Sequence, residues 1–217
     1  MFFQPYEGSR YRCAEGFHDG LKLLVLGESH YVEGYDPVKD SSPRACAPFT
    51  KEVVEDFFLP IGSRPHYELN SIRGRLHRLL TGIDEPTEQQ ARDAWSKIAY
   101  ANYIQKFVGD TALARKTSEH WRSGENALQG MLEYLAPDRV LIFGKATWNH
   151  IHHGRWLIES WRAGGRNRGL WGFDVRGLTV PATWVMHPSW GRDDVSTMRE
   201  VLTGLMADRW SANGQFV

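Results

Sequence analysis

The chain has 217 residues, of which 26 are Lys or Arg and 26 are Asp or Glu, so its formal net charge is zero. This balance excludes a general electrostatic attraction to nucleic acid, and any such binding must depend on a local basic patch. No stretch approaches the roughly 18 consecutive apolar residues of a membrane span. The first residues carry no basic segment ahead of an apolar one, so we expect a cytoplasmic protein with no membrane partner.

Length and cysteine content limit the class of protein further. A chain of this size suits a single domain, and we expect one that covers residues 1–217. Cys13 and Cys46 are the only cysteines, too few for a disulfide framework or a four-thiolate cluster. We therefore expect no metal site and no cofactor.

The first strong structural signal is the apolar run at residues 23–27. Such a run is typical of a strand that is buried on both faces, and it stops at Gly27. Glu28, Ser29, His30 and Tyr31 follow it as a polar loop. Loops at the carboxyl ends of parallel strands are where open α/β sheets bind their ligands, so this loop is the first candidate for chemistry.

Strands and helices alternate along the rest of the chain. Apolar runs predict further strands at residues 98–104, 139–144 and 183–186, and an edge strand or hairpin arm at 169–175. Helical spacing predicts helices over residues 51–59, 68–80, from 86 onward, 119–135, 146–151 and 195–207. Four arginines around Gly164–Gly165 are interpreted as a loop or a local basic patch. The alternation predicts a three-layer α/β/α sandwich with a central, mostly parallel four-stranded sheet.

Polar residues follow all four central strands. They are the first loop from Gly27 to Tyr31, Asn102, Gly144–Lys145 and His187–Ser189. Because parallel strands place their carboxyl ends on the same side of a sheet, we expect these segments to meet along one edge.

In this order the four segments resemble the uracil-DNA glycosylase superfamily. The best-known branch reads Gly-Gln-Asp-Pro-Tyr in its first loop, has an asparagine at the end of its second strand, and begins its last loop with His-Pro-Ser-Pro. The resemblance spans about residues 20 to 208. It implies a monomeric protein that binds single- or double-stranded DNA, extrudes a uracil or modified base into a pocket and cleaves the N-glycosidic bond.

The resemblance also implies individual roles in recognising and releasing the base. Asn102 would read the edge of the extruded base, Phe49 would stack on its face, and Gly27 with Tyr31 would line the pocket. His187 would donate a hydrogen bond to the departing base, an interaction worth roughly 3–4 kcal/mol in other enzymes.

Other residues would contact the DNA outside the pocket. In the last loop Trp190–Gly191–Arg192 stands where the family inserts an apolar wedge into the duplex, and Ser189 just before it would also contact the DNA. Trp190 would fill the vacated stack and Arg192 would pair with a phosphate. Lys145 would add a further DNA contact.

The first loop departs from the best-known branch at one catalytic position. Ser29 stands where that branch has an aspartate, and Glu28 is the nearest carboxylate. A glutamate followed by a small residue is similar to the iron–sulfur branch, but two cysteines cannot form its cluster. A base-binding module of the same fold that does not hydrolyse is therefore a second interpretation.

Interpretations outside this superfamily also remain open. A serine hydrolase would use Ser29 as nucleophile and His187 as base, although Tyr31 replaces the second glycine of the usual nucleophile turn. A metal enzyme would use the histidines at 150, 152 and 153, whose spacing directs neighbouring side chains apart on a helix. Taken singly, Asn102 could cap a turn, while Phe49 and His187 could be core residues.

Overall fold

A computed structural model describes residues 2–34, 36, 46–59, 71–111, 114–151, 155–190 and 194–207. The protein is of the mixed α/β class and is built on one seven-stranded sheet with the order β1-β3-β2-β4-β7-β6-β5. The strands are β1 (Tyr6–Glu7), β2 (Leu23–Gly27), β3 (Ile98–Asn102), β4 (Arg139–Phe143), β5 (Arg155–Ala163), β6 (Arg166–Val175) and β7 (Leu178–Val185).

The centre of the sheet is parallel. Strand β2 pairs in parallel with β3 and with β4, and β4 pairs in parallel with β7. Every residue of β2, β3 and β4 is buried, which explains why these strands appear in the sequence as continuous apolar runs. The four predicted central strands are confirmed, with parallel pairing throughout.

The predicted number of four strands is wrong, because antiparallel strands extend the sheet on both sides. Strand β1 pairs with β3, while β6 pairs with β7 and β5 pairs with β6. The predicted hairpin arm at residues 169–175 is confirmed as part of β6. The arginine-rich segment before it was interpreted as a loop or a local basic patch; the loop interpretation is wrong, because the segment forms β5 and the start of β6.

The β5–β6 hairpin turns at Gly164–Gly165. Ala163 pairs with Arg166, so the turn has two residues, and both have positive φ, 55° and 71°. A two-residue turn of this kind matches the twist of the flanking strands and favours glycine at both positions. Most of β5 is partly or fully exposed on both faces, so the strand lacks the apolar pattern that identified the central strands.

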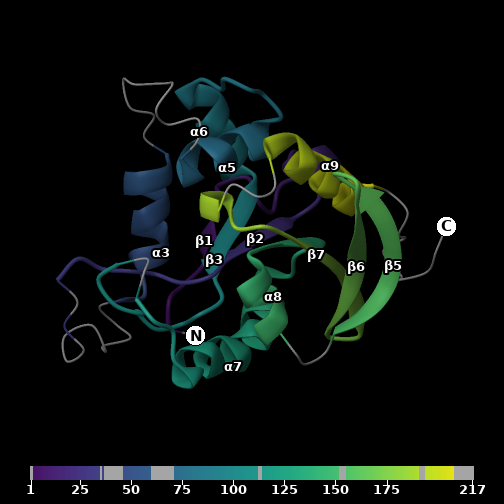
Figure 1. Ribbon diagram of the computed structural model, residues 1–217. Coiled ribbons are helices and arrows are strands. Elements are labelled where there is room, and N and C mark those ends of the chain that lie inside the picture. The colour runs from purple at the N-terminus through teal and green to yellow at the C-terminus, as the bar shows by residue number, and fades with distance from the viewer. Residues whose placement is uncertain are drawn as a thin grey trace.

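Helices lie on both faces of the sheet (Figure 1). Helices α5 (Ile72–Thr81), α6 (Glu88–Ser96) and α9 (Val195–Met206) lie on one side, and α7 (Ser118–Leu135) and α8 (Lys145–His150) on the other. The remaining helical elements are α1 (Phe17–Gly20), α3 (Phe49–Glu52), η2 (Val53–Phe58) and η3 (Pro188–Trp190).

The two faces of the sheet enclose separate apolar cores. Val25 of β2 packs into the cluster that includes α5, α6 and α9 residues, whereas its neighbours Leu24 and Leu26 pack into the cluster that includes α7 residues. This division follows from the two-residue periodicity of a strand. Within the described residues, no helix is both long enough and apolar enough to cross a membrane.

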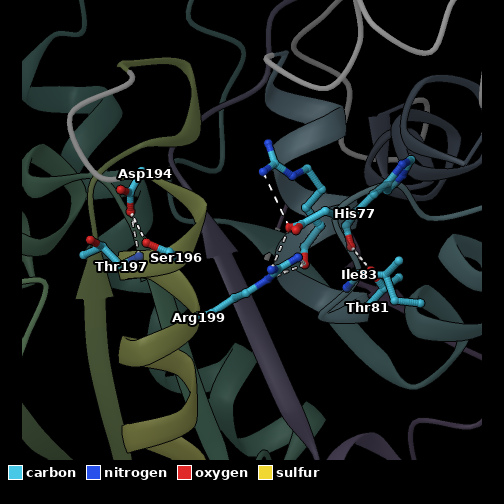
Figure 2. Close-up of polar contacts among 9 residues, drawn as sticks. His77, Thr81, Ile83, Asp194, Ser196, Thr197 and Arg199 are labelled. Carbon is cyan, nitrogen blue, oxygen red and sulfur yellow. Dashed lines mark hydrogen bonds and ion pairs between the residues drawn. The ribbon is translucent and has the colours of Figure 1, made fainter.

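Polar contacts end the helices and join α9 to α5. Helix α5 ends at Gly82, which adopts the left-handed conformation there. Figure 2 shows Asp194 capping α9 through Ser196 and Thr197. It also shows Arg199 extending from α9 toward α5, where its guanidinium donates to the backbone carbonyl of Arg78. The Arg199 contacts hold α9, the helix that follows the His187 loop, against α5.

Candidate functional site

The polar segments predicted to follow the central strands lie along one edge of the sheet. Gly27 at the end of β2 pairs with Asn102 at the end of β3. Gly144, which follows β4, donates its N–H to the carbonyl of Val185 at 2.9 Å. A Cβ atom added to Gly144 would lie 3.7 Å from Cβ of His187. The backbone thus brings together residues that are up to 160 positions apart in the sequence.

Asn102 lies directly over Gly27. A Cβ atom added to Gly27 would come within 2.2 Å of Asn102 Oδ1 and within 2.6 Å of the Tyr100 hydroxyl. Any side chain at position 27 would therefore displace both groups, and this close approach explains the glycine. The Tyr100 hydroxyl donates to Asn102 Oδ1 at 3.1 Å, so the amide is held in one place above β2.

His187 is held by the loop that follows it. The backbone N–H of Ser189 donates to His187 Nδ1 at 3.3 Å, and the Ser189 hydroxyl lies 2.7 Å from the same nitrogen. A nitrogen that accepts a backbone N–H carries no proton, so the neutral ring has its proton on Nε2. Burial lowers the pKa of His187; Glu28 raises it and Lys116 lowers it further, with a net lowering. Near neutral pH the ring is an uncharged donor.

Glu28 forms an ion pair with Lys116 from the segment before α7. Their atoms Oε1 and Nζ are 2.7 Å apart, and the two side chains are only 17% and 19% exposed. The Lys116 ammonium also lies 5.5 Å from the centre of the Tyr31 ring. Burial lowers the pKa of Lys116, but hydrogen bonds to Glu28 and Tyr31 outweigh it and raise the net value. The lysine is therefore a stable cation that fixes two first-loop residues.

Electrostatic coupling connects the parts of the site. The charges of Glu28 and Lys116 both act on the pKa of His187. Burial raises the pKa of Tyr100, and Tyr31 raises it further. Because these interactions fall off with distance, they place the Glu28–Lys116 pair near His187 and Tyr31 near Tyr100.

Ser29 and His30 point to different partners. The Ser29 hydroxyl donates to the Tyr31 hydroxyl at 2.9 Å. His30 is 3% exposed, and its Nε2 lies 2.9 Å from the Thr50 hydroxyl. Burial lowers the pKa of His30 to about 3. His30 is therefore a neutral core histidine that bonds to Thr50.

Phe49 lies at the start of α3, next to His30. Its ring centre is 5.1 Å from that of His30 and 4.7 Å from that of Phe107, both in edge-to-face geometry. Thr50 lies within α3 and its hydroxyl bonds to His30. Phe49 is partly buried in this aromatic cluster, and it contacts the first loop through the ring of His30. Stacking of Phe49 on a base remains a prediction.

The expected DNA contacts are only partly described. Lys145 is exposed as the first residue of α8, and Ser189 is exposed beside His187. Trp190 belongs to η3, but its side chain lies outside the described residues, as does the whole of Arg192. Their roles on DNA therefore remain predictions.

The histidines of the metal alternative do not gather in the described part of the chain. His150 stacks on Trp121 with ring centres 3.7 Å apart, and residues 152 and 153 lie outside the described ranges. No group of three or more His, Cys, Asp or Glu residues is placed to hold a metal ion among the residues that the structure describes.

Two residues of the site were not identified from the sequence. Tyr100 was assigned to the strand but given no role, although its spacing of two from Asn102 places both on the same face. Lys116 precedes the predicted helix at 119–135, and nothing in the local sequence connects it with Glu28. The spacing between Tyr100 and Asn102 was therefore a usable signal. The position of Lys116 beside Glu28 depends instead on how α7 packs against the sheet.

No protein-family model matches the chain, and no curated protein sequence matches it. Functional conclusions therefore rest on the geometry of the site and on the chemistry of its side chains.

Proposed function

We propose that the protein binds DNA, accepts an extruded base at the carboxyl edge of its parallel strands, and cleaves the bond between that base and the sugar. Two side chains at one edge of the sheet carry the proposal. Asn102, an oriented amide, ends β3, and His187, a neutral imidazole, follows β7; these two strands flank the central pair β2 and β4. The helices on both faces, in a three-layer arrangement around four parallel strands, support the proposal.

Asn102 and His187 have complementary tasks in this reaction. An asparagine amide offers one donor and one acceptor direction to the pairing edge of a base. Bond cleavage leaves positive character on the sugar and negative charge on the departing base. His187 carries its remaining proton on Nε2, and this N–H is the donor that would stabilise the charge on the base. The Ser189 contacts keep the ring in that tautomer.

Glu28 is the carboxylate available to the cationic sugar. Its charge is paired with Lys116, so the two together supply less negative potential than a lone carboxylate would. This pairing favours a second candidate function, a module that recognises an extruded base in DNA without hydrolysing it.

A serine hydrolase has less support from the described contacts. The Ser29 hydroxyl bonds to Tyr31, whereas His187 Nδ1 bonds to Ser189. An acyl-transfer mechanism needs a hydrogen bond between the nucleophile and its base, and these two residues make none in the described part of the chain.

Oligonucleotides that contain uracil or another modified base test the proposal. Released base would leave abasic sites that break in alkali, and Asn102→Ala is expected to abolish release, whereas Asn126→Ala on the exposed face of α7 is expected to keep it. Binding of base-modified DNA without strand breakage would establish the second candidate. If no tested base is released and no binding of base-modified DNA depends on Asn102, both candidate functions are wrong.

A further inference from the structure

A cavity of about 460 Å³ lies at the edge of the sheet opposite the candidate site. Residues 16–18 line it shortly before β2 begins, and Lys97 lines it directly before β3 begins. Because β2 and β3 are parallel, their amino ends lie at the edge away from Gly27 and Asn102. We propose that this cavity is a second binding site, for an uncharged aromatic molecule that carries an amide or lactam group. This inference does not depend on the function proposed above.

The cavity is formed by three helical segments. Helices α5 and α6 pack side by side (Figure 1). The last turn of α5 and one face of α6 line the cavity together with α1. Small-molecule sites usually have volumes of about 300–1,000 Å³, so the cavity is large enough for a ligand of two fused rings.

The buried part of the cavity lining is apolar. Phe17, Leu80 and Ala94 are buried and belong to the apolar core on this face of the sheet. Ile83 also lines the cavity, and its side chain is exposed to solvent. A flat aromatic ring in the cavity would remove apolar surface from water on the protein and on the ligand, which favours binding.

The charged side chains of the lining are already paired. Asp93 Oδ2 lies 2.8 Å from Lys97 Nζ, and the same carboxylate also pairs with Arg10. A charged ligand would therefore give up its hydration without meeting an unpaired opposite charge in the described part of the lining. These ion pairs favour an uncharged ligand.

Two glutamines of α6 supply hydrogen-bonding groups to the cavity. Gln90 Oε1 accepts from the backbone N–H of Thr87 at 2.8 Å, so its Nε2 is left to donate. Gln89 is exposed and makes no hydrogen bond within the described part of the chain, so its amide offers both a donor and an acceptor. An amide or lactam group presents the complementary acceptor and donor.

The turn that lines the cavity across from α6 has a rare backbone conformation. His18 and Asp19 have positive φ, 40° and 61°, and Gly20 follows with 90°. Residues other than glycine seldom adopt this region, and such outliers are common in segments that bind ligands. The His18 ring packs edge-on against Phe17, and both residues line the cavity. The turn therefore presents aromatic side chains to a ligand.

Three probes of similar size separate the effects of ring, amide and charge. Isoquinolin-1-one is a bicyclic lactam, isoquinoline has the rings without the amide, and 1-naphthoate is charged. In ¹H–¹⁵N NMR titrations of the wild-type protein, we expect the lactam to bind most tightly and to shift the signals of His18, Ile83 and Lys97, but not those of Asn102 and His187. No saturable shift, shifts at Asn102 and His187 instead, or equal affinity for all three probes would overturn the inference.

Gln89→Leu tests the contribution of the amide, and Gln129→Leu is the matched control. Gln129 lies on the exposed face of α7, where its Nε2 donates to Glu133. We expect Gln89→Leu to weaken binding of the lactam about five- to tenfold, as the loss of one hydrogen bond implies, and to leave isoquinoline unaffected. Gln129→Leu should change neither affinity.

Two outcomes of this comparison would overturn the inference. One is an unchanged affinity of Gln89→Leu for the lactam, and the other is an equal weakening of the lactam and isoquinoline. Gln89 is exposed, so its substitution should leave the fold intact. None of these measurements uses DNA, so their failure is distinguishable from a failure of the proposed function.

Discussion

Ser189 Oγ lies 2.7 Å from His187 Nδ1, and the Ser189 backbone N–H donates to the same nitrogen. This relationship fixes the proton of the neutral ring on Nε2, the nitrogen that would face the departing base. The loop therefore does more than place the histidine, because it also selects the tautomer.

Substitution of Ser189 tests this selection. Ser189→Ala removes the hydroxyl contact but keeps the backbone N–H, so we expect base release in single-turnover experiments to fall about five- to tenfold. Ser189 is exposed, so the melting temperature should change little. Ser196→Ala is the matched control, because that hydroxyl bonds to Asp194 at the start of α9. An equal loss in both variants would argue against a role in the tautomer.

The charges of the first loop are expected to tune His187. Lys116 lowers the pKa of His187 and Glu28 raises it. Lys116→Met should therefore raise the pKa of the His187 imidazole, and Glu28→Gln should lower it. NMR titration of the His187 ring protons measures both changes. Lys106→Met is the control, because Lys106 pairs with Glu119; a shift in this variant as large as that in Lys116→Met would contradict the assignment.

Because His30 is buried and neutral, we expect the free energy of unfolding to fall in acid. Burial lowers the pKa of His30 to about 3 from the ordinary 6.5, so the unfolded chain takes up the proton first as the pH falls. The stability that neutral His30 contributes is present above pH 6.5 and is lost progressively from there down to about pH 3, with a slope of up to about 1.4 kcal/mol per pH unit.

Urea unfolding at a series of pH values measures this slope. His30→Gln is expected to lower the free energy of unfolding at pH 7 and to flatten its decline between pH 6.5 and pH 4. His18→Gln replaces an exposed ring and should retain the wild-type slope. If His30→Gln retains it too, another group is responsible for the acid sensitivity.

Two glycine substitutions should have opposite effects. A Cβ atom at position 27 would come within 2.2 Å of Asn102 Oδ1, so Gly27→Ala is expected to displace the amide, abolish recognition of the base and destabilise the protein by about 1–3 kcal/mol. Nothing lies within 4 Å of a Cβ atom at Gly130 in α7, so Gly130→Ala should stabilise the helix by up to about 1 kcal/mol. Thermal unfolding measures the change in stability of both variants, and base-release assays measure the loss of recognition in Gly27→Ala. Wild-type stability and base release in Gly27→Ala would show that the strand ends have room to move.

Much of the central fold could be predicted because its signals are local. The continuous apolar runs of β2, β3 and β4 identify strands that are buried on both faces, and Gly82 marks the end of α5. The β5 strand was missed because its side chains are exposed on both faces, so that burial imposed no pattern on its sequence. Its turn carried the clearer signal, since two consecutive glycines between paired strands are typical of a tight hairpin.

The candidate site divides in the same way. By itself, the sequence determined which strands end in polar loops, and so predicted that Gly27, Asn102 and His187 would meet at one edge, because parallel strands align their carboxyl ends. Only the tertiary structure decided that Lys116 neutralises Glu28, that Tyr100 orients Asn102, and that His30 is a buried partner of Thr50. These pairings depend on side-chain packing between segments that are distant in the chain, and local periodicity carries no information about such contacts.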